Sequence, residues 1–188
     1  MHTYDRNYFK IALPAALEGL FMILLASTDL IMVGALGALS IAAVSIFMQP
    51  RLILLCFSRS LASSVTLLVS QKAGAGDTKG TSDIMKKSLM LCAIFMGLLH
   101  ILFYIFLDDI FYLMGANDEY MAEAMAYGPI ALAAVYVTSL TLILQAVQLG
   151  YGRTSVIMKT NVCGNVVNLA LNALLIFGFG PIPSLGVT

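Results

Sequence analysis

Long apolar runs separated by short polar connections fill most of this 188-residue chain. A helix of about 20 mainly apolar residues crosses a bilayer. By that measure the sequence predicts five complete membrane-spanning helices, at about residues 7–33, 40–71, 86–107, 119–150 and 154–178. The second and fourth are longer than a bilayer requires, so we expect them to tilt or to project into the cytoplasm. The chain then ends in what we expect to be the start of a sixth helix, so the predicted fold is an all-α polytopic membrane protein.

Polar side chains recur along single faces of these predicted helices. In the fifth span the asparagines are spaced by four, three and four residues, which places them on one face: Asn161, Asn165, Asn168 and Asn172. An amide that faces acyl chains has no hydrogen-bonding partner, so this face is expected to meet protein or a water-filled cavity. Such a ladder can join helices by hydrogen bonds, or it can contact an ion, water or a substrate. We favour the cavity interpretation.

The second and fourth spans carry similar polar faces. In the second span the polar positions are Ser45, Gln49, Cys56, Arg59, Ser63, Thr66 and Ser70, and in the fourth they are Thr138, Thr141, Gln145 and Gln148. A single hydroxyl in a span usually bonds its own helix or a neighbouring one. An amide needs more partners, because it has two donors and an acceptor. The residues that we expect to line a substrate cavity are Gln49, Thr141, Gln145, Asn161 and Asn165.

The first predicted span carries two carboxylates on one face, because Glu18 and Asp29 are eleven residues, or three helical turns, apart. Met22 and Leu25 lie between them on that face. Asp29 is near the outer end, where one interpretation is an interfacial carboxylate in water. We favour a carboxylate in a cavity that exchanges a proton or a sodium ion for substrate, which makes Asp29 the expected sodium ligand. Glu18 is deeper, and a pair with Arg59 would lower the cost of burying either charge.

Charge in the connections predicts the orientation of the chain. Basic residues precede the first span and lie around the second and fourth connections: Arg6, Lys10, Lys72, Lys79, Lys86, Lys87, Arg153 and Lys159. Residues 34–39 and 108–118 contain no lysine or arginine. Because cytoplasmic connections are enriched in these residues, we expect a cytoplasmic N-terminus in a multi-pass protein of the cell (inner) membrane.

Composition narrows the class of protein. Hydrophobic residues make up 60% of the chain and charged residues 11%, whereas soluble domains average about a quarter charged. The net charge is zero, so the chain lacks the basic surface that a nucleic-acid partner would need. The apolar composition makes the lipid bilayer its expected surroundings. No His, Cys or carboxylate group has metal-ligand spacing, and no nucleophile–base set stands out. We therefore expect no catalytic residue, no bound cofactor and no enzyme activity.

Five ordered motifs resemble those of multidrug and toxic compound extrusion (MATE) transporters. They lie at residues 11–14, 28–34, 69–77, 150–155 and 165–172, with the sequences IALP, TDLIMVG, VSQKAGAGD, GYGRTS and NVVNLALN. The resemblance implies a twelve-helix antiporter of two six-helix lobes, in which entry of Na+ or H+ drives export of amphipathic, often cationic drugs. This chain would then supply a truncated N-terminal lobe, as a fragment or as a truncated gene product. Its expected partners are the missing C-terminal lobe and a small drug-like substrate.

The resemblance also implies roles for single residues. Asp29 matches the first-helix carboxylate that the family ties to cation or proton coupling, and Asn168 and Asn172 match the pair that accompanies it. Because one branch has aspartate where Asn172 stands, the NorM-like branch fits better. Pro14 matches the proline whose kink accompanies rearrangement of the first helix.

Two features of the chain depart from the family pattern. Arg153 stands where an acidic residue is usual, and Arg51 and Arg59 are unexpected in the second span. Arg59 slightly favours an alternative function, a lipid-linked oligosaccharide flippase or polysaccharide exporter of the same superfamily. The absence of metal-ligand groups and nucleophile–base sets argues against an intramembrane enzyme. Only the polar faces and the ordered motifs argue against a receptor or channel.

Overall fold

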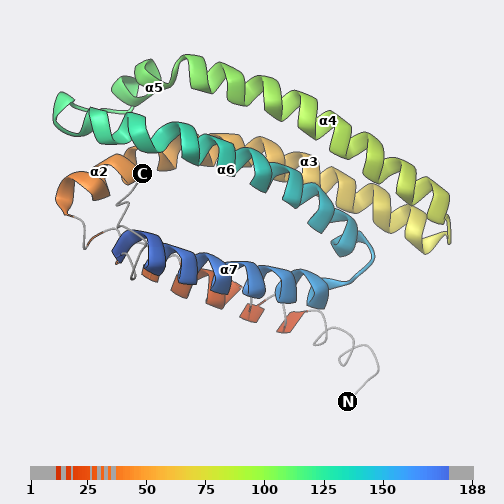
Figure 1. The fold of residues 1–188 in the computed structure, drawn as a ribbon. Coiled ribbons are helices and arrows are strands. Elements are labelled where there is room, and N and C mark those ends of the chain that lie inside the picture. The colour runs from red at the N-terminus through yellow and green to blue at the C-terminus, as the bar shows by residue number, and fades with distance from the viewer. Residues whose placement is uncertain are drawn as a thin grey trace.

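The computed structural model describes residues 12, 13, 16, 17, 19–25, 27, 28, 31, 34 and 37–177, and this part of the chain is helical and contains no strand. Its labelled helices are α2 (Ala38–Ile46), α3 (Met48–Gly74), α4 (Thr78–Ile105), α5 (Leu107–Leu113), α6 (Asp118–Gly150) and α7 (Thr154–Phe177). Figure 1 shows α3, α4 and α6 packed alongside one another, with α7 beside the N-terminal helical residues in a separate layer. The predicted all-α membrane fold is confirmed.

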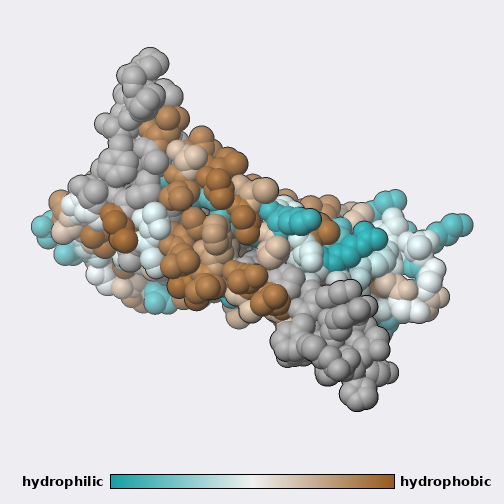
Figure 2. Space-filling model, turned by 90° about the horizontal axis from the view of Figure 1, so that it is seen from below, coloured by the Kyte–Doolittle hydropathy of each residue, from teal (hydrophilic) through white to brown (hydrophobic). Residues whose placement is uncertain are grey.

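Three segments of the described chain are long and apolar enough to cross a membrane. They are Ala38–Gly74, Thr78–Ile105 and Asp118–Gly150. Apolar side chains gather over the middle of the face in Figure 2, and hydrophilic ones lie towards the ends. Large apolar side chains are also exposed along α4, including Leu91, Leu98 and Ile105. Such a surface suits acyl chains rather than water. The number of spans and their boundaries stay predictions.

Helix α2 and helix α3 are separated by an interruption at Phe47, inside the range 40–71 for which the sequence predicted one helix. The Phe47 side chain is 2% exposed. Its ring meets Phe111 of α5 and Tyr127 of α6 edge-to-face, with centroid distances of 6.5 and 5.8 Å. Edge-to-face pairs at such distances stabilise a buried aromatic cluster. This cluster ties the interruption to α5, which occupies part of the predicted connection 108–118.

A buried serine pair joins α3 to α6 in the centre of the packed helices. The Ser58 hydroxyl lies 2.8 Å from Ser139 Oγ, and both side chains are fully buried. Ser139 in turn donates to the carbonyl of Val135 at 2.8 Å. Small residues let helix backbones approach, and a hydroxyl pair satisfies itself where no water is available. The pair therefore fixes how α3 sits against α6, which form two walls of the site described below.

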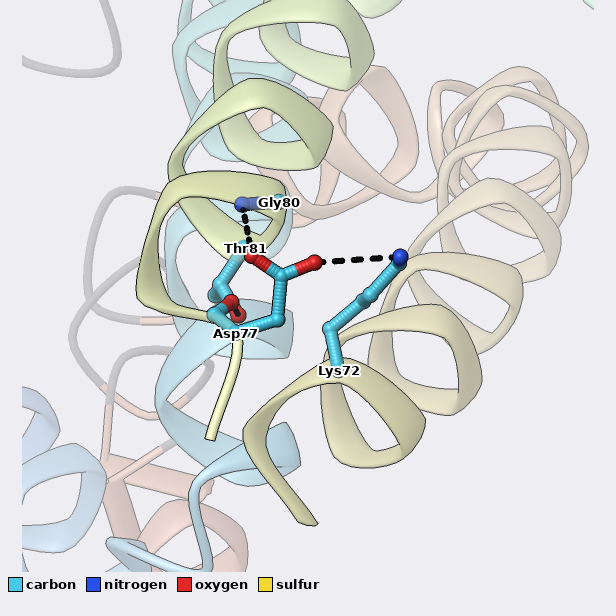
Figure 3. A network of polar contacts seen from close by, with 4 residues as sticks. All are labelled: Lys72, Asp77, Gly80 and Thr81. Atoms are coloured by element: carbon cyan, nitrogen blue, oxygen red, sulfur yellow. Dashed lines mark hydrogen bonds and ion pairs between the residues drawn. The ribbon is translucent and has the colours of Figure 1, made fainter. Parts of the chain in front are cut away.

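The glycine-rich connection between α3 and α4 is a capped turn. Asp77 precedes α4, and its carboxylate accepts a hydrogen bond from the Gly80 backbone N–H at 2.8 Å and one from Lys72 Nζ at 3.1 Å (Figure 3). These bonds lower the pKa of Asp77, with the Gly80 bond the larger cause. The cap starts α4 at Thr78, before the predicted membrane boundary at residue 86. Gly76, at φ +72°, supplies the left-handed conformation that the turn needs.

Candidate functional site

A cavity of about 660 Å³ lies between α3, α6 and the beginning of α7. Its lining residues are Arg59, Ala62, Ser63, Thr66, Leu67, Ser70, Leu142, Gln145, Ala146, Leu149, Thr154 and Ile157. Pockets for small organic molecules commonly have volumes of about 300–1,000 Å³. This cavity is therefore large enough for a drug-sized molecule, and it combines a polar side with apolar walls.

The polar side of the cavity comes mainly from α3. Arg59, Ser63, Thr66 and Ser70 line it at spacings of four, three and four residues, which is one helical face. This is the polar face that the sequence indicated for the second span. Gln49, a predicted lining residue on the same helix, is exposed and does not belong to this lining.

Helix α3 contacts α6 along the floor of the cavity. Thr66 Oγ1 lies 3.1 Å from the carbonyl of Ala62 in its own helix and 3.3 Å from the carbonyl of Ala146 in α6. The hydroxyl thus bridges two helices while its residue lines the cavity. Thr66 therefore both packs two helices together through its hydroxyl and lines the cavity.

An amide pair joins α6 to α7 beside the cavity. Gln145 Nε2 donates to Asn161 Oδ1 at 2.7 Å, and both side chains are half-buried. Gln145 is one of the residues that line this cavity, whereas Asn161 is its hydrogen-bond partner on α7. Thr141 is exposed, donates to the Val137 carbonyl of its own helix at 3.0 Å, and does not line this cavity. Of the predicted lining residues on α6, Gln145 is thus the one at the cavity.

The asparagine face of α7 meets the N-terminal helical residues. Asn165 Nδ2 lies 2.7 Å from Met22 Sδ, which is a weak hydrogen-bond acceptor. Met22 belongs to the face on which the sequence places Glu18 and Asp29. One turn of α7 further on, Asn172 Nδ2 donates to Asn168 Oδ1 at 3.1 Å. The Asn165–Met22 contact thus joins α7 to the N-terminal helical residues, whose red ribbon lies beside the blue α7 in Figure 1.

Several predicted functional residues fall outside the described part of the chain. Pro14, Glu18 and Asp29 are among them, so the coupling role of Asp29, the Glu18–Arg59 pair and the kink at Pro14 stay predictions. Within residues 37–177 and the shorter described stretches, no three His, Cys, Asp or Glu side chains are grouped to hold a metal ion.

Sequence reasoning missed the apolar walls of the cavity. Leu67, Leu142, Leu149 and Ile157 line it together with Thr154 at the start of α7. An apolar residue that faces a cavity has the same sequence signal as one that faces lipid. The sequence offers one indirect signal, which is position along the chain. Leu67 directly follows the polar lining residue Thr66, and Leu149 lies beside the predicted connection after residue 150.

The predicted function assigns no role to His100. It is buried between α4 and α6, where Nδ1 donates to the Met96 carbonyl at 2.7 Å. Its ring meets Tyr136 edge-to-face at a centroid distance of 5.5 Å, at the side of a smaller cavity of about 420 Å³. These contacts are those of a packed aromatic side chain.

The Gln145–Asn161 bond gives a prediction that separates helix joining from cavity lining. We expect Gln145→Ala and Asn161→Ala to be coupled by about 0.6 kcal/mol, and by no more than about 1.7 kcal/mol, as for other hydrogen bonds between membrane helices. Thermal unfolding of the two single variants and the double variant of the full-length protein in detergent measures this coupling. Thr141→Val, one turn away on α6, is the control and should show no coupling to Asn161→Ala.

Comparison with known proteins places these observations in a family. The family model MatE matches residues 14–174. The chain is 28% identical over 185 residues to the probable multidrug resistance protein NorM of Rhizobium meliloti, covering 98% of this chain and 39% of that protein. It is 25% identical over 188 residues to the FAD transporter of Shewanella oneidensis, covering 97% of this chain and 40% of that protein. The chain thus spans about 40% of the length of the curated relatives that it matches.

Solved structures share the fold. The MATE transporter VcmN of Vibrio cholerae superposes with a TM-score of 0.90 at 21% identity, covering 97% of this chain and 41% of that one. A MOP superfamily transporter from Pyrococcus furiosus superposes with a TM-score of 0.85 at 24% identity, covering 96% and 39%. The fold of this chain is therefore shared with about 40% of each of these transporters.

Proposed function

The chain belongs to the MatE family, and we propose that it forms the N-terminal part of a cation-coupled antiporter that exports amphipathic, often cationic compounds. The observation that carries this proposal is the cavity between α3, α6 and α7, which has a polar face, apolar walls and the volume of a drug-sized molecule. Relatives named as multidrug resistance proteins support the same substrate class.

Coupling is assigned in this proposal to Asp29 together with Asn168 and Asn172. The contact between Asn165 and Met22 supports it, because it sets the asparagine face of α7 against the face that carries Asp29 in the sequence. A carboxylate inside a membrane protein marks an ion or proton pathway more often than a packing position. The coupling ion in the proposal is Na+ or H+, with Asp29 as its ligand.

The complete activity requires a second lobe in this proposal. The chain covers 39% of its Rhizobium meliloti relative, and an antiporter with alternating access needs two halves that move against each other. We place the assembled protein in the cell membrane with a cytoplasmic N-terminus, on the strength of the basic residues around the second and fourth connections.

Ethidium efflux tests the proposed function. Cells of a drug-sensitive host that express the full-length protein, once loaded with ethidium, should lose it faster than cells with an empty vector. Addition of sodium should increase the rate if Na+ is the coupling ion, and external acidification should increase it if H+ is. Equal ethidium loss in both strains, under both gradients, would rule out this export function.

A second candidate is a lipid-linked oligosaccharide flippase or polysaccharide exporter. Arg59 favours it, because the substrates of such proteins carry phosphate groups and Arg59 lines the cavity. We rank this function second, because such a substrate favours a strongly cationic cavity and Arg59 is the one charged side chain in the described lining. Accumulation of a lipid-linked precursor in a deletion strain, without any change in ethidium loss, would reverse this order.

A further inference from the structure

Arg59 is a cation deep in a predicted membrane span. It lies three residues from Cys56, the middle of the 37-residue segment Ala38–Gly74. At 1.5 Å per residue, it is about 20 Å along the helix axis from Lys72 at the cytoplasmic end of α3. A guanidinium at this depth does not contact lipid without a partner, so it faces protein, water or a polar ligand. The structure places it on the lining of the cavity.

Neither Arg59 nor Ser63, one helical turn away, uses its side-chain donors on another residue of the described part of the chain. Arg59 forms no ion pair or hydrogen bond with any residue that the structure describes, and the Ser63 hydroxyl likewise has no described partner. Both residues line the cavity on the same face of α3. The site therefore offers a guanidinium and a hydroxyl to whatever enters it.

The charge of the described lining is unbalanced. It contains one guanidinium, several hydroxyls and one amide, that of Gln145, and none of the described lining residues is a carboxylate. The amide donor of Gln145 is already bonded to Asn161. The predicted partner Glu18 lies outside the described residues, and an anionic ligand would compete with it for the same guanidinium. Leu67, Leu142 and Leu149 supply apolar surface beside these donors.

We propose that this cavity binds amphipathic compounds that carry a phosphate or carboxylate group, with the anionic group held by the Arg59 guanidinium and the Ser63 hydroxyl. The guanidinium fork matches the two oxygens of such a group, and charge-assisted bonds are stronger than neutral ones. The apolar body of the compound packs on the leucine side of the cavity. The inference rests on the proposed transport function and adds organic anions and zwitterions to the amphipathic compounds that the protein would bind.

Two ligands that differ only in a phosphate test this assignment. The purified full-length protein in nanodiscs of phosphatidylcholine is titrated with riboflavin and with flavin mononucleotide, and binding is followed by quenching of flavin fluorescence. We expect the phosphate to improve the dissociation constant about tenfold, the gain expected of a charge-assisted pair. Arg59→Gln should reduce this preference to about onefold, and Arg59→Lys should keep part of it because the charge remains.

The chain contains a matched control for the charge itself. Arg51 lies on the same helix and is also exposed, but it does not line the cavity, so Arg51→Gln should keep the full phosphate preference. A wild-type protein without phosphate preference, or an Arg59→Gln variant that keeps it, would overturn the inference. Size-exclusion profiles and riboflavin binding of each variant show that the fold is intact.

The anionic group could belong to a solute or to a lipid, and a second set of nanodiscs separates these sources. If phosphatidylglycerol weakens binding of flavin mononucleotide to the wild type but not to Arg59→Gln, then a lipid headgroup occupies the site. If it weakens neither, the site is selective for the solute. Failure of the proposed export is distinguishable from failure of this inference, because the binding measurement needs no gradient and ethidium efflux needs no phosphate.

Discussion

Asp29→Asn in the full-length protein is expected to reduce gradient-driven ethidium efflux by at least about tenfold, since a coupling carboxylate is a functional group that an amide does not replace. Asparagine has nearly the same shape, so packing is preserved while the charge and the proton-binding site are lost. The choice of this residue follows from the family resemblance, and Met22, which lies on the same predicted face, contacts Asn165. The initial efflux rate under Na+ and H+ gradients is the measurement.

The control for Asp29→Asn is Asp83→Asn. Asp83 is an exposed carboxylate near the start of α4, and it does not line the cavity. Its substitution removes the same charge and should leave efflux unchanged. Efflux by Asp29→Asn at the wild-type rate, from a protein present at the wild-type level, would remove Asp29 from the coupling role.

The helices and their polar faces were predictable because the signal lies within each helix. The repeat of Arg59, Ser63, Thr66 and Ser70 at helical spacing indicated one face of α3, and that face lines the cavity. The connection between α3 and α4 was predictable as well, since the apolar run ends near residue 71 and a glycine-rich stretch with nearby lysines follows it. Local chemistry was sufficient in both cases.

Relations between helices were not predictable in the same way. Ser58 and Ser139 are 81 positions apart and bond each other, yet each alone looks like any small residue in a span. The interruption at Phe47 depends on Phe111 and Tyr127, which approach it only in the folded chain. Gln49 was indistinguishable from Gln145 by residue type, but only Gln145 reaches the cavity, because the position of each helix relative to its neighbours decides this.

The cavity is lined by polar and apolar residues that come from different parts of the sequence. Donors on α3 and the Gln145 amide of α6, which bonds to Asn161 of α7, form its polar side, and leucines form its apolar side. This arrangement explains how a site in an apolar protein can accept amphipathic molecules, whose two ends need different surroundings. Helices α3 and α6 both line the cavity and touch each other at Thr66 and Ala146, so we expect the contact that keeps them close to matter for both stability and binding.

Gly150→Ala is expected to separate α3 from α6 at the edge of the cavity. A Cβ atom at Gly150 would lie 2.6 Å from Val69 Cγ1, 2.7 Å from Val69 Cβ and 3.0 Å from the Thr66 carbonyl oxygen. Two of these atoms belong to or adjoin backbone and do not rotate away. Overpacking of this kind costs about 1–3 kcal/mol, and the better helix propensity of alanine offsets at most about 1 kcal/mol.

The expected result is therefore a lower melting temperature for Gly150→Ala in detergent, together with weaker ligand binding. If the helices part, we expect the hydrogen bond from Thr66 Oγ1 to the Ala146 carbonyl, which is already 3.3 Å long, to break first. Binding should then weaken, because both residues line the cavity and would no longer be held in place. Gly74→Ala is the matched control, since a Cβ there meets nothing within 4 Å. It should leave both quantities unchanged or raise stability slightly, through helix propensity alone. A melting temperature of Gly150→Ala equal to that of Gly74→Ala would mean that α3 and α6 can separate at this point without loss of stability.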